Sequence, residues 1–208
     1  MNENEYRDLI ATTAERDAIH GTIYEWSDEL NGLIALYNNY PNIGRGIKYS
    51  PTLGGWCMLY VSTLFIQCGI GDIIQPEIGA YEPMKNAKMA GRWKYRKSGY
   101  IPKRGDIIHY AFPRTDEKGN TFTQYHVGIV TNADANVIYS TEGNVENRVV
   151  MRANCNWIDN EDIDGFILPE YEKISDVVTV PAPPTKDGNY MLTATVTEGE
   201  YELTWKGI

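Results

Sequence analysis

The feature that most constrains the fold is a change in hydrophobic periodicity along the 208 residues. Up to residue 70, apolar residues recur at helical spacing in the segments 4–18, 22–37 and 56–70. From residue 105 onward, short segments with strand character are separated by Asn, Asp, Gly or Pro, namely 105–112, 125–132, 136–144, 148–152 and 164–171. Helices followed by antiparallel strands predict an α+β domain, with N-terminal helices packed on a sheet of about five or six strands.

The length and composition favour one well-buried domain with an appendage. Hydrophobic residues make up 42% of the chain and charged residues 23%, as in ordinary globular proteins. We assign the domain to residues 1–172, a stiff proline-rich linker to 173–189, and a hairpin or the start of an incomplete second module to 190–208. Two strands alone cannot hold a core, so we expect the hairpin either to dock on the domain or to begin a further module.

The charge and the N-terminus exclude several classes of partner. The net charge of -9 is spread along the chain without a basic stripe, so nucleic acid is not an expected partner. The start MNENEYRDLI has neither the basic residues nor the apolar run of a secretory signal, and no stretch approaches the roughly 18 apolar residues of a spanning helix. We therefore expect a monomeric, soluble protein that is made in the cytoplasm and does not insert into membranes.

The cysteines indicate a free thiol. There are three of them, Cys57, Cys68 and Cys155, with no C-x-x-C motif, which fits neither a disulfide framework nor a structural zinc site. Cys57 and Cys68 lie in the same predicted helix and are roughly 16 Å apart along its axis, too far for a disulfide. Cys68 continues the apolar face of that helix, and we expect both Cys68 and Cys155 to be inert.

Cys57 has the position of a nucleophile. A thiol attacks only as its thiolate, and the unpaired amides and dipole at the first turn of a helix stabilise that anion. The preceding Gly54 and Gly55 allow a substrate to approach the backbone closely, and the Cys57 amide can donate to a developing oxyanion. Trp56 is more often a core residue in such a position, but it could also line a sugar or peptide groove.

A base and a group to orient it are found among the predicted strands. His126 opens the segment HVGIV after a polar, turn-rich stretch, so we expect it at the rim of the sheet, facing the helix. Glu142 and Asn144 are two residues apart and so share one face of an extended chain, where either could hold the imidazole. His109 belongs to an alternating strand and is the alternative base should His126 lie elsewhere.

Four segments together resemble the successive motifs of the CHAP family of cysteine, histidine-dependent amidohydrolases and peptidases, over roughly residues 40–172. They are GGWCMLYVSTLFIQCGI, YIPKRGDIIHYAF, YHVGIVTNADANVIYSTEGNVENRVVMR and IDGFILPEY. The resemblance implies a papain-like fold, with Cys57 as nucleophile, His126 as general base and acid, Glu142 as the group that orients the imidazole, and Asn144 as its polar neighbour. It gives Asp106 only a structural role.

The same resemblance implies a hydrolase of bacterial peptidoglycan that cleaves the muramoyl–L-alanine amide or a bond in the stem or cross-bridge peptide. No cofactor is expected, and the family's calcium-binding Asp-x-Asp run before the nucleophile is missing, so we predict no metal site. Without a signal, such an enzyme fits a phage or prophage endolysin, or an effector exported by another route. Two alternatives are a cytoplasmic amidase for small peptide or polyamine conjugates and a catalytically silent wall-binding module.

Overall fold

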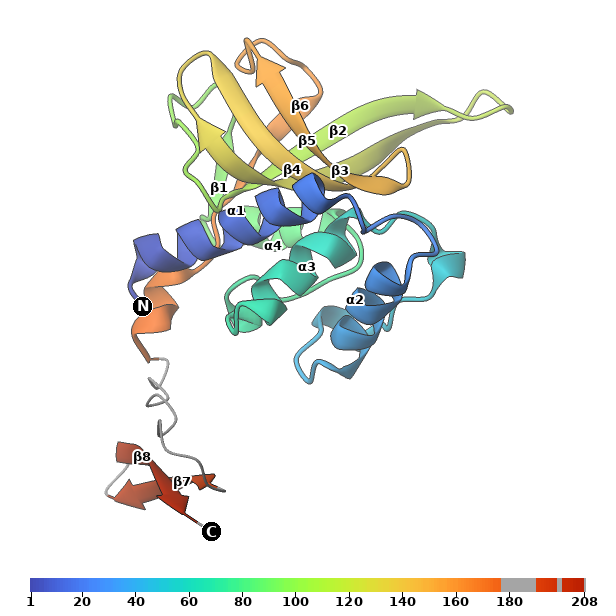
Figure 1. The fold of residues 1–208 in the computed structure, drawn as a ribbon. Coiled ribbons are helices and arrows are strands. Elements are labelled where there is room, and N and C mark those ends of the chain that lie inside the picture. Colours follow the sequence, from blue (N-terminus) through green and yellow to red (C-terminus); the bar gives the residue numbers. More distant parts are fainter. Residues whose placement is uncertain (177–189, 198–199, 208) are drawn as a thin grey trace. The chain divides into compact units, whose positions relative to one another are not determined.

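The computed structural model describes the backbone of residues 1–176, 190–197 and 200–207, and the side chains up to residue 174. The chain divides into two units, Met1–Ile174 and Ser175–Ile208. Within its described residues, the first unit has four α-helices and one antiparallel sheet of six strands, in the order β1-β6-β2-β3-β4-β5 (Figure 1). The predicted α+β class, with helices before a sheet of five or six strands, is confirmed.

The helices are α1 (Glu3–His20), α2 (Asp28–Asn39), α3 (Cys57–Gln67) and α4 (Tyr81–Met89). The strands of the six-stranded sheet are β1 (Trp93–Tyr95), β2 (Ile107–Thr115), β3 (Thr121–Ala133), β4 (Val137–Val145), β5 (Arg148–Cys155) and β6 (Ile163–Ile167). The described segment between α2 and α3 contains two single-turn 3-10 segments, Gly44–Gly46 and Pro51–Leu53.

Helical spacing extended the second predicted helix back to residue 22, while Ser27, Asp28 and Glu29 resembled a local helix start. The helix begins at that local start, Asp28, because the Ser27 hydroxyl accepts a hydrogen bond from the Leu30 amide at 3.1 Å and caps the helix there. Helix α4 and strand β1 were not predicted. The strand has only three residues, too few to show a periodicity, and exists because Trp93 pairs with Ile167 of β6.

Helix α3 is the centre of the domain. Every residue from Cys57 to Ile66 is buried, as expected for a helix that is apolar on all sides. Figure 1 shows α3 and α1 on the same side of the sheet, and α3 contacts both β3 and β4. The surrounding elements therefore fix the N-terminus of α3, and with it Cys57, against the middle of the sheet.

Asp106 ties the N-terminal helix to the start of β2. Its carboxylate is fully buried and accepts hydrogen bonds from Arg7 Nη1 at 2.8 Å, the Tyr100 hydroxyl at 2.6 Å and the Lys103 amide at 2.8 Å. A buried ion pair is tolerated when further hydrogen bonds satisfy the carboxylate in this way. These contacts agree with the structural role that was predicted for Asp106.

In the second unit, β7 (Tyr190–Thr197) and β8 (Glu200–Gly207) pair antiparallel in a two-stranded sheet. Residues 198–199 of the predicted hairpin and residues 177–189 of the predicted linker lie outside the described residues. The predicted domain and linker boundaries therefore stay predictions. Among the described helices, none combines the length and the apolar character that crossing a bilayer requires.

Candidate active site

Cys57 is the first residue of α3, and Trp56 is its N-cap. The Trp56 side chain makes no capping hydrogen bond, so it does not occupy the backbone amides of the first turn. Cys57 is buried but not fully, with 8% of its surface exposed. The loop before it is held in place by Tyr49, whose hydroxyl donates to the Gly54 carbonyl at 2.6 Å. A helix terminus thus presents a sulfur and free backbone donors together.

His126 connects this thiol to Glu142. Its Nε2 lies 3.0 Å from Glu142 Oε2, and since a carboxylate only accepts, Nε2 carries the proton and Nδ1 is left for the sulfur. Burial lowers the pKa of His126, but its interactions with the Cys57 thiol and with Glu142 outweigh burial and raise it to about 9. The ring is therefore an imidazolium at neutral pH, beside a group that is reactive as an anion.

Glu142 is fully buried and is held by four side chains. Oε1 accepts from the Tyr110 hydroxyl at 2.6 Å and the Ser140 hydroxyl at 2.7 Å, while Oε2 accepts from Arg152 Nη1 at 3.2 Å and from His126. Burial alone would raise the pKa of Glu142, but the bonds from His126, Ser140 and Tyr110 lower it overall. The carboxylate is thus kept ionised in the interior.

A second layer supports these donors. Asn154 Nδ2 lies 3.0 Å from the Tyr110 hydroxyl and 3.4 Å from Ser140 Oγ, and donates to both. Tyr110, Ser140, Arg152 and Asn154 were not among the residues predicted for the site. Two signals could have found the first two: Ser140 precedes Glu142 by one strand repeat, and Tyr110 pairs in register with His126.

The sequence predicted that His126 opens its strand, and this prediction is wrong. Strand β3 begins at Thr121, because residues 121–125 continue the ladder with 111–115 of β2, and this hairpin extends beyond the rest of the sheet (Figure 1). Residues 121–124 are exposed on both faces, so they give no alternating pattern from which the strand could have been recognised.

Gly128 explains the glycine that follows His126 in the motif HVG. A Cβ at this position would lie 2.4 Å from Glu142 Cγ and 2.9 Å from the Thr141 carbonyl oxygen. Such distances are too short for any side chain. The absence of a side chain at Gly128 therefore leaves room for the Glu142 side chain, which extends from β4 to the imidazole of His126.

Asn144 reaches the site by a different route from the one predicted. The β4–β5 ladder changes register between Glu142 and Val145, and Asn144 has a left-handed φ of 60°, so the simple two-residue repeat of a strand does not apply. Its Nδ2 lies 3.0 Å from the point that a Cβ on Gly55 would occupy. Asn144 therefore lies against the exposed loop that precedes Cys57.

The remaining candidates are buried. Trp56, predicted as a possible groove residue, is only 2% exposed, because its ring lies beneath Gly143. The alternative base His109 is fully buried between the rings of Trp93 and Tyr125, each 5.4 Å away, and burial lowers its pKa to about 4. The structure thus brings His126, and not His109, to the thiol.

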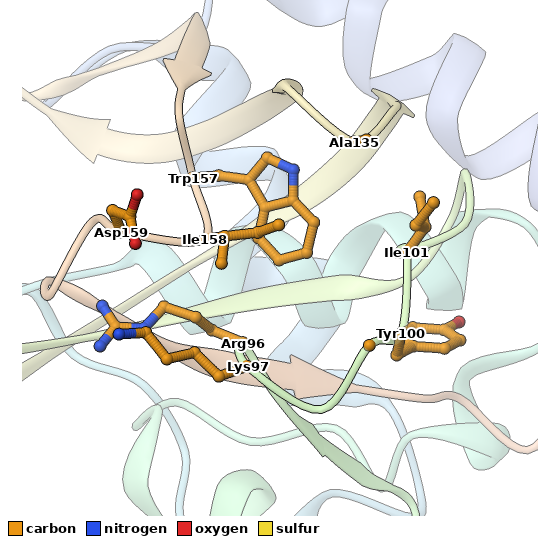
Figure 2. Close-up of a pocket in the computed structure, with 9 residues that line it drawn as sticks. Arg96, Lys97, Tyr100, Ile101, Ala135, Trp157, Ile158 and Asp159 are labelled. Atoms are coloured by element: carbon orange, nitrogen blue, oxygen red, sulfur yellow. The ribbon is translucent and has the colours of Figure 1, made fainter.

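All three cysteines are free, with Cys68 partly buried and Cys155 exposed. A hollow of about 590 Å³ contains Arg96, Lys97 and Trp157 in its lining, and none of the predicted site residues (Figure 2). In the part of the chain that the structure describes, no group of three or more His, Cys, Asp or Glu side chains is arranged to hold a metal ion.

A thiol at a helix terminus, an imidazole and a buried carboxylate in this order form the constellation of a nucleophile, its base and an orienting acid. Residues 48–144 match the family model of the CHAP domain. This match agrees with the predicted resemblance to the CHAP family, whose members are generally hydrolytic amidases and peptidases associated with peptidoglycan. The match extends from just before Cys57 to Asn144 and so includes every predicted site residue. Neither a curated protein nor a solved structure matches the chain.

Proposed function

We propose that this chain is a cysteine-dependent hydrolase of bacterial peptidoglycan that cleaves the muramoyl–L-alanine amide or a bond in the stem or cross-bridge peptide. The observation that supports the proposal best is the chain of contacts from Cys57 through His126 to a buried, ionised Glu142. The match to the CHAP family model supports peptidoglycan as the substrate class.

In the first half of the proposed reaction, the Cys57 sulfur attacks the amide carbonyl carbon and the oxygen becomes an oxyanion. The Cys57 amide at the start of α3 donates to that oxygen. The His126 imidazolium then gives its proton to the leaving nitrogen, the C–N bond breaks, and a thioester to Cys57 remains. A pKa of about 9 keeps His126 charged and able to donate this proton at neutral pH.

In the second half, water hydrolyses the thioester. The now neutral His126 takes a proton from the attacking water, the oxygen bonds to the carbonyl carbon, and the sulfur leaves as a thiolate beside the restored imidazolium. Glu142 holds the ring so that Nδ1 faces the sulfur throughout. We assign Asn144 to the positioning of the loop at Gly55.

The test is digestion of purified wall sacculi followed by mass spectrometry of the products. New lactyl termini on muramic acid indicate an amidase, and new peptide amino termini indicate an endopeptidase. Cys57→Ala is expected to lower the rate by at least about a thousandfold, because it removes the nucleophile. Cys68→Ala is the matched control, since it changes a partly buried thiol in the same helical segment, and it should remain active.

The same samples separate the alternatives. A silent wall-binding module would leave sacculi uncut, bind them equally well after Cys57→Ala, and show no alkylation of Cys57 by iodoacetamide at pH 7. An amidase for small conjugates would be alkylated at Cys57 but release nothing from the wall. Either result would reject the proposal.

The proposal includes release of the enzyme to the wall, either by a separate pore or by a non-classical export route. A pore-forming gene beside its own would indicate a role in lysis, and an immunity gene would indicate a toxin.

A further inference from the structure

A second pocket lies at the β4–β5 turn, which follows Asn144 in the chain. It has a volume of about 370 Å³, and Tyr24, Glu25, Trp26, Glu146 and Arg148 are among its lining residues. We call it the Trp26 pocket. It forms where the segment before α2 pairs with the β4–β5 turn: Tyr24 bridges to Arg148, and the Glu25 amide donates to the Asn147 carbonyl at 2.7 Å.

Two observations relate the Trp26 pocket to the thiol. Burial raises the pKa of Tyr49, and the charges of Glu25 and Cys57 raise it further, so Tyr49 lies within electrostatic reach of both groups. On the other side, Asn144 lies against Gly55, and the chain enters the pocket two residues later at Glu146. We therefore expect a substrate bound at Cys57 to extend along Asn144 toward the pocket.

Trp26 occupies a position that its own backbone disfavours. The Ser27 amide donates to the Tyr24 carbonyl at 3.0 Å, which closes a four-residue turn with Trp26 at its third position and a φ of 72°. Turns with a positive φ there favour glycine, and a bulky residue is strained. The ring is also 71% exposed, so it does not repay this strain by packing in the core. Contact with a ligand is a role that the exposed ring can fill.

The charges of the pocket favour a cation. Glu146 is already paired with Arg148 at 3.2 Å. Glu25 has no ion-pair partner among the residues that the structure describes, and it stands between Tyr24 and Trp26 in the chain, whose side chains are 53% and 71% exposed. An unpaired carboxylate beside exposed aromatic rings suits an ammonium group, which gains from both the carboxylate and the ring faces.

We infer that the Trp26 pocket binds a primary ammonium group of the peptide part of the wall substrate, with Glu25 as counter-ion and Trp26 as aromatic wall. This inference rests on the proposed function and adds a recognition site to it. It predicts that peptides with a free amine bind better than the same peptides with that amine acetylated, because acetylation removes the charge.

The test measures binding of soluble muropeptides by calorimetry in a Cys57→Ala background, with free and with acetylated amines. We expect the free amine to bind about fivefold more tightly, as for an exposed cation–π contact with a partly exposed ion pair. Glu25→Gln and Trp26→Gly should each reduce this difference, and Trp26→Gly should leave the protein at least as stable, since glycine relieves the turn. Tyr95→Ser is the matched control, because it removes an exposed ring from β1, the opposite edge strand, and should keep the preference.

The outcomes are separable. Equal binding of both peptide forms, or an unchanged preference in Glu25→Gln, would overturn the ammonium site while leaving the proposed function intact. No binding of either form, with sacculi uncut by the chain that retains Cys57, would overturn the proposed function and this inference together.

Discussion

Replacing Tyr110 by phenylalanine tests whether Glu142 is a buried anion. The substitution removes one hydroxyl, which donates to Glu142 Oε1 at 2.6 Å, and leaves a ring that is 1% exposed in place. A hydrogen bond to a charged group contributes about 1.5–3 kcal/mol to stability. Ser140 still donates to the same oxygen, and Asn154 keeps its bond to Ser140, so we expect a loss of about 2 kcal/mol.

Tyr171→Phe is the control for this measurement. Tyr171 is 2% exposed and donates at 2.9 Å to the Gly105 carbonyl, a neutral acceptor. A bond of this kind contributes about 1 kcal/mol. Urea unfolding of both variants at pH 7, compared at an unchanged m-value, should therefore show the larger loss in free energy of unfolding for Tyr110→Phe. An equal or smaller loss would refute the conclusion that a charged Glu142 lies under His126.

The activity of Tyr110→Phe is a second test of the role of this hydroxyl. Glu142 is fully buried, and its position depends on the donors around it. Loss of the Tyr110 hydroxyl leaves the carboxylate with more freedom, so sacculus digestion should slow, but by less than in Glu142→Gln, where the anionic partner of His126 itself is gone. Full activity in Tyr110→Phe would show that the hydroxyl contributes to stability and not to the position of the imidazole.

Three further predictions follow from the site. Glu142→Gln removes one of the interactions that raise the His126 pKa to about 9, so the alkaline limb of the rate against pH, where the imidazolium proton is lost, should move to lower pH in that variant. Gly128→Ala places a Cβ 2.4 Å from Glu142 Cγ, so it should cost about 1–3 kcal/mol in urea unfolding and most of the activity. His109 is buried and its pKa is lowered to about 4, so unfolded chains bind the extra proton first as pH falls below the ordinary value near 6.5. Stability should therefore decrease between about pH 6.5 and 4, by on the order of 3 kcal/mol at the lower end, and His109→Phe should flatten that decrease. An unchanged pH–rate profile in Glu142→Gln, unchanged stability and activity in Gly128→Ala, or an unchanged dependence of stability on pH in His109→Phe would contradict the respective prediction.

The sequence predicted the elements that hold the site better than the contacts within it. The apolar run of α3 is long and periodic, so both its burial and the position of Cys57 in its first turn could be read directly. The strands that carry His126 and Glu142 could be recognised as short apolar segments bounded by Asn, Asp or Gly, and both are buried on both faces where they cover the core. The length and apolar character of a segment report that it is buried, and these elements are defined by their burial.

The parts that were missed depend on contacts between distant segments. The hydroxyl of Tyr110 approaches Glu142 only because β2, β3 and β4 are adjacent in the sheet, and a strand pattern does not state that order. The conformation of Asn144 follows from a register shift, which is likewise invisible in a period of two. The turn at Trp26 was predicted as helix, because its aromatic residues fit helical spacing and its positive φ has no signal without glycine.

The charges of the site explain why so much buried polarity is tolerated around one thiol. With the imidazole protonated and the sulfur ionised, the order is thiolate, imidazolium, carboxylate and guanidinium, from Cys57 through His126 and Glu142 to Arg152. Each charge has an opposite neighbour, so no ion in the interior is left uncompensated. Arg152 is 44% exposed, and this last charge lies at the surface, where water also solvates it. When the imidazolium gives up its proton to the leaving amine, the sulfur has become a neutral thioester. The proton and the sulfur charge are therefore lost together, and the chain of charges stays balanced as the acyl-enzyme forms.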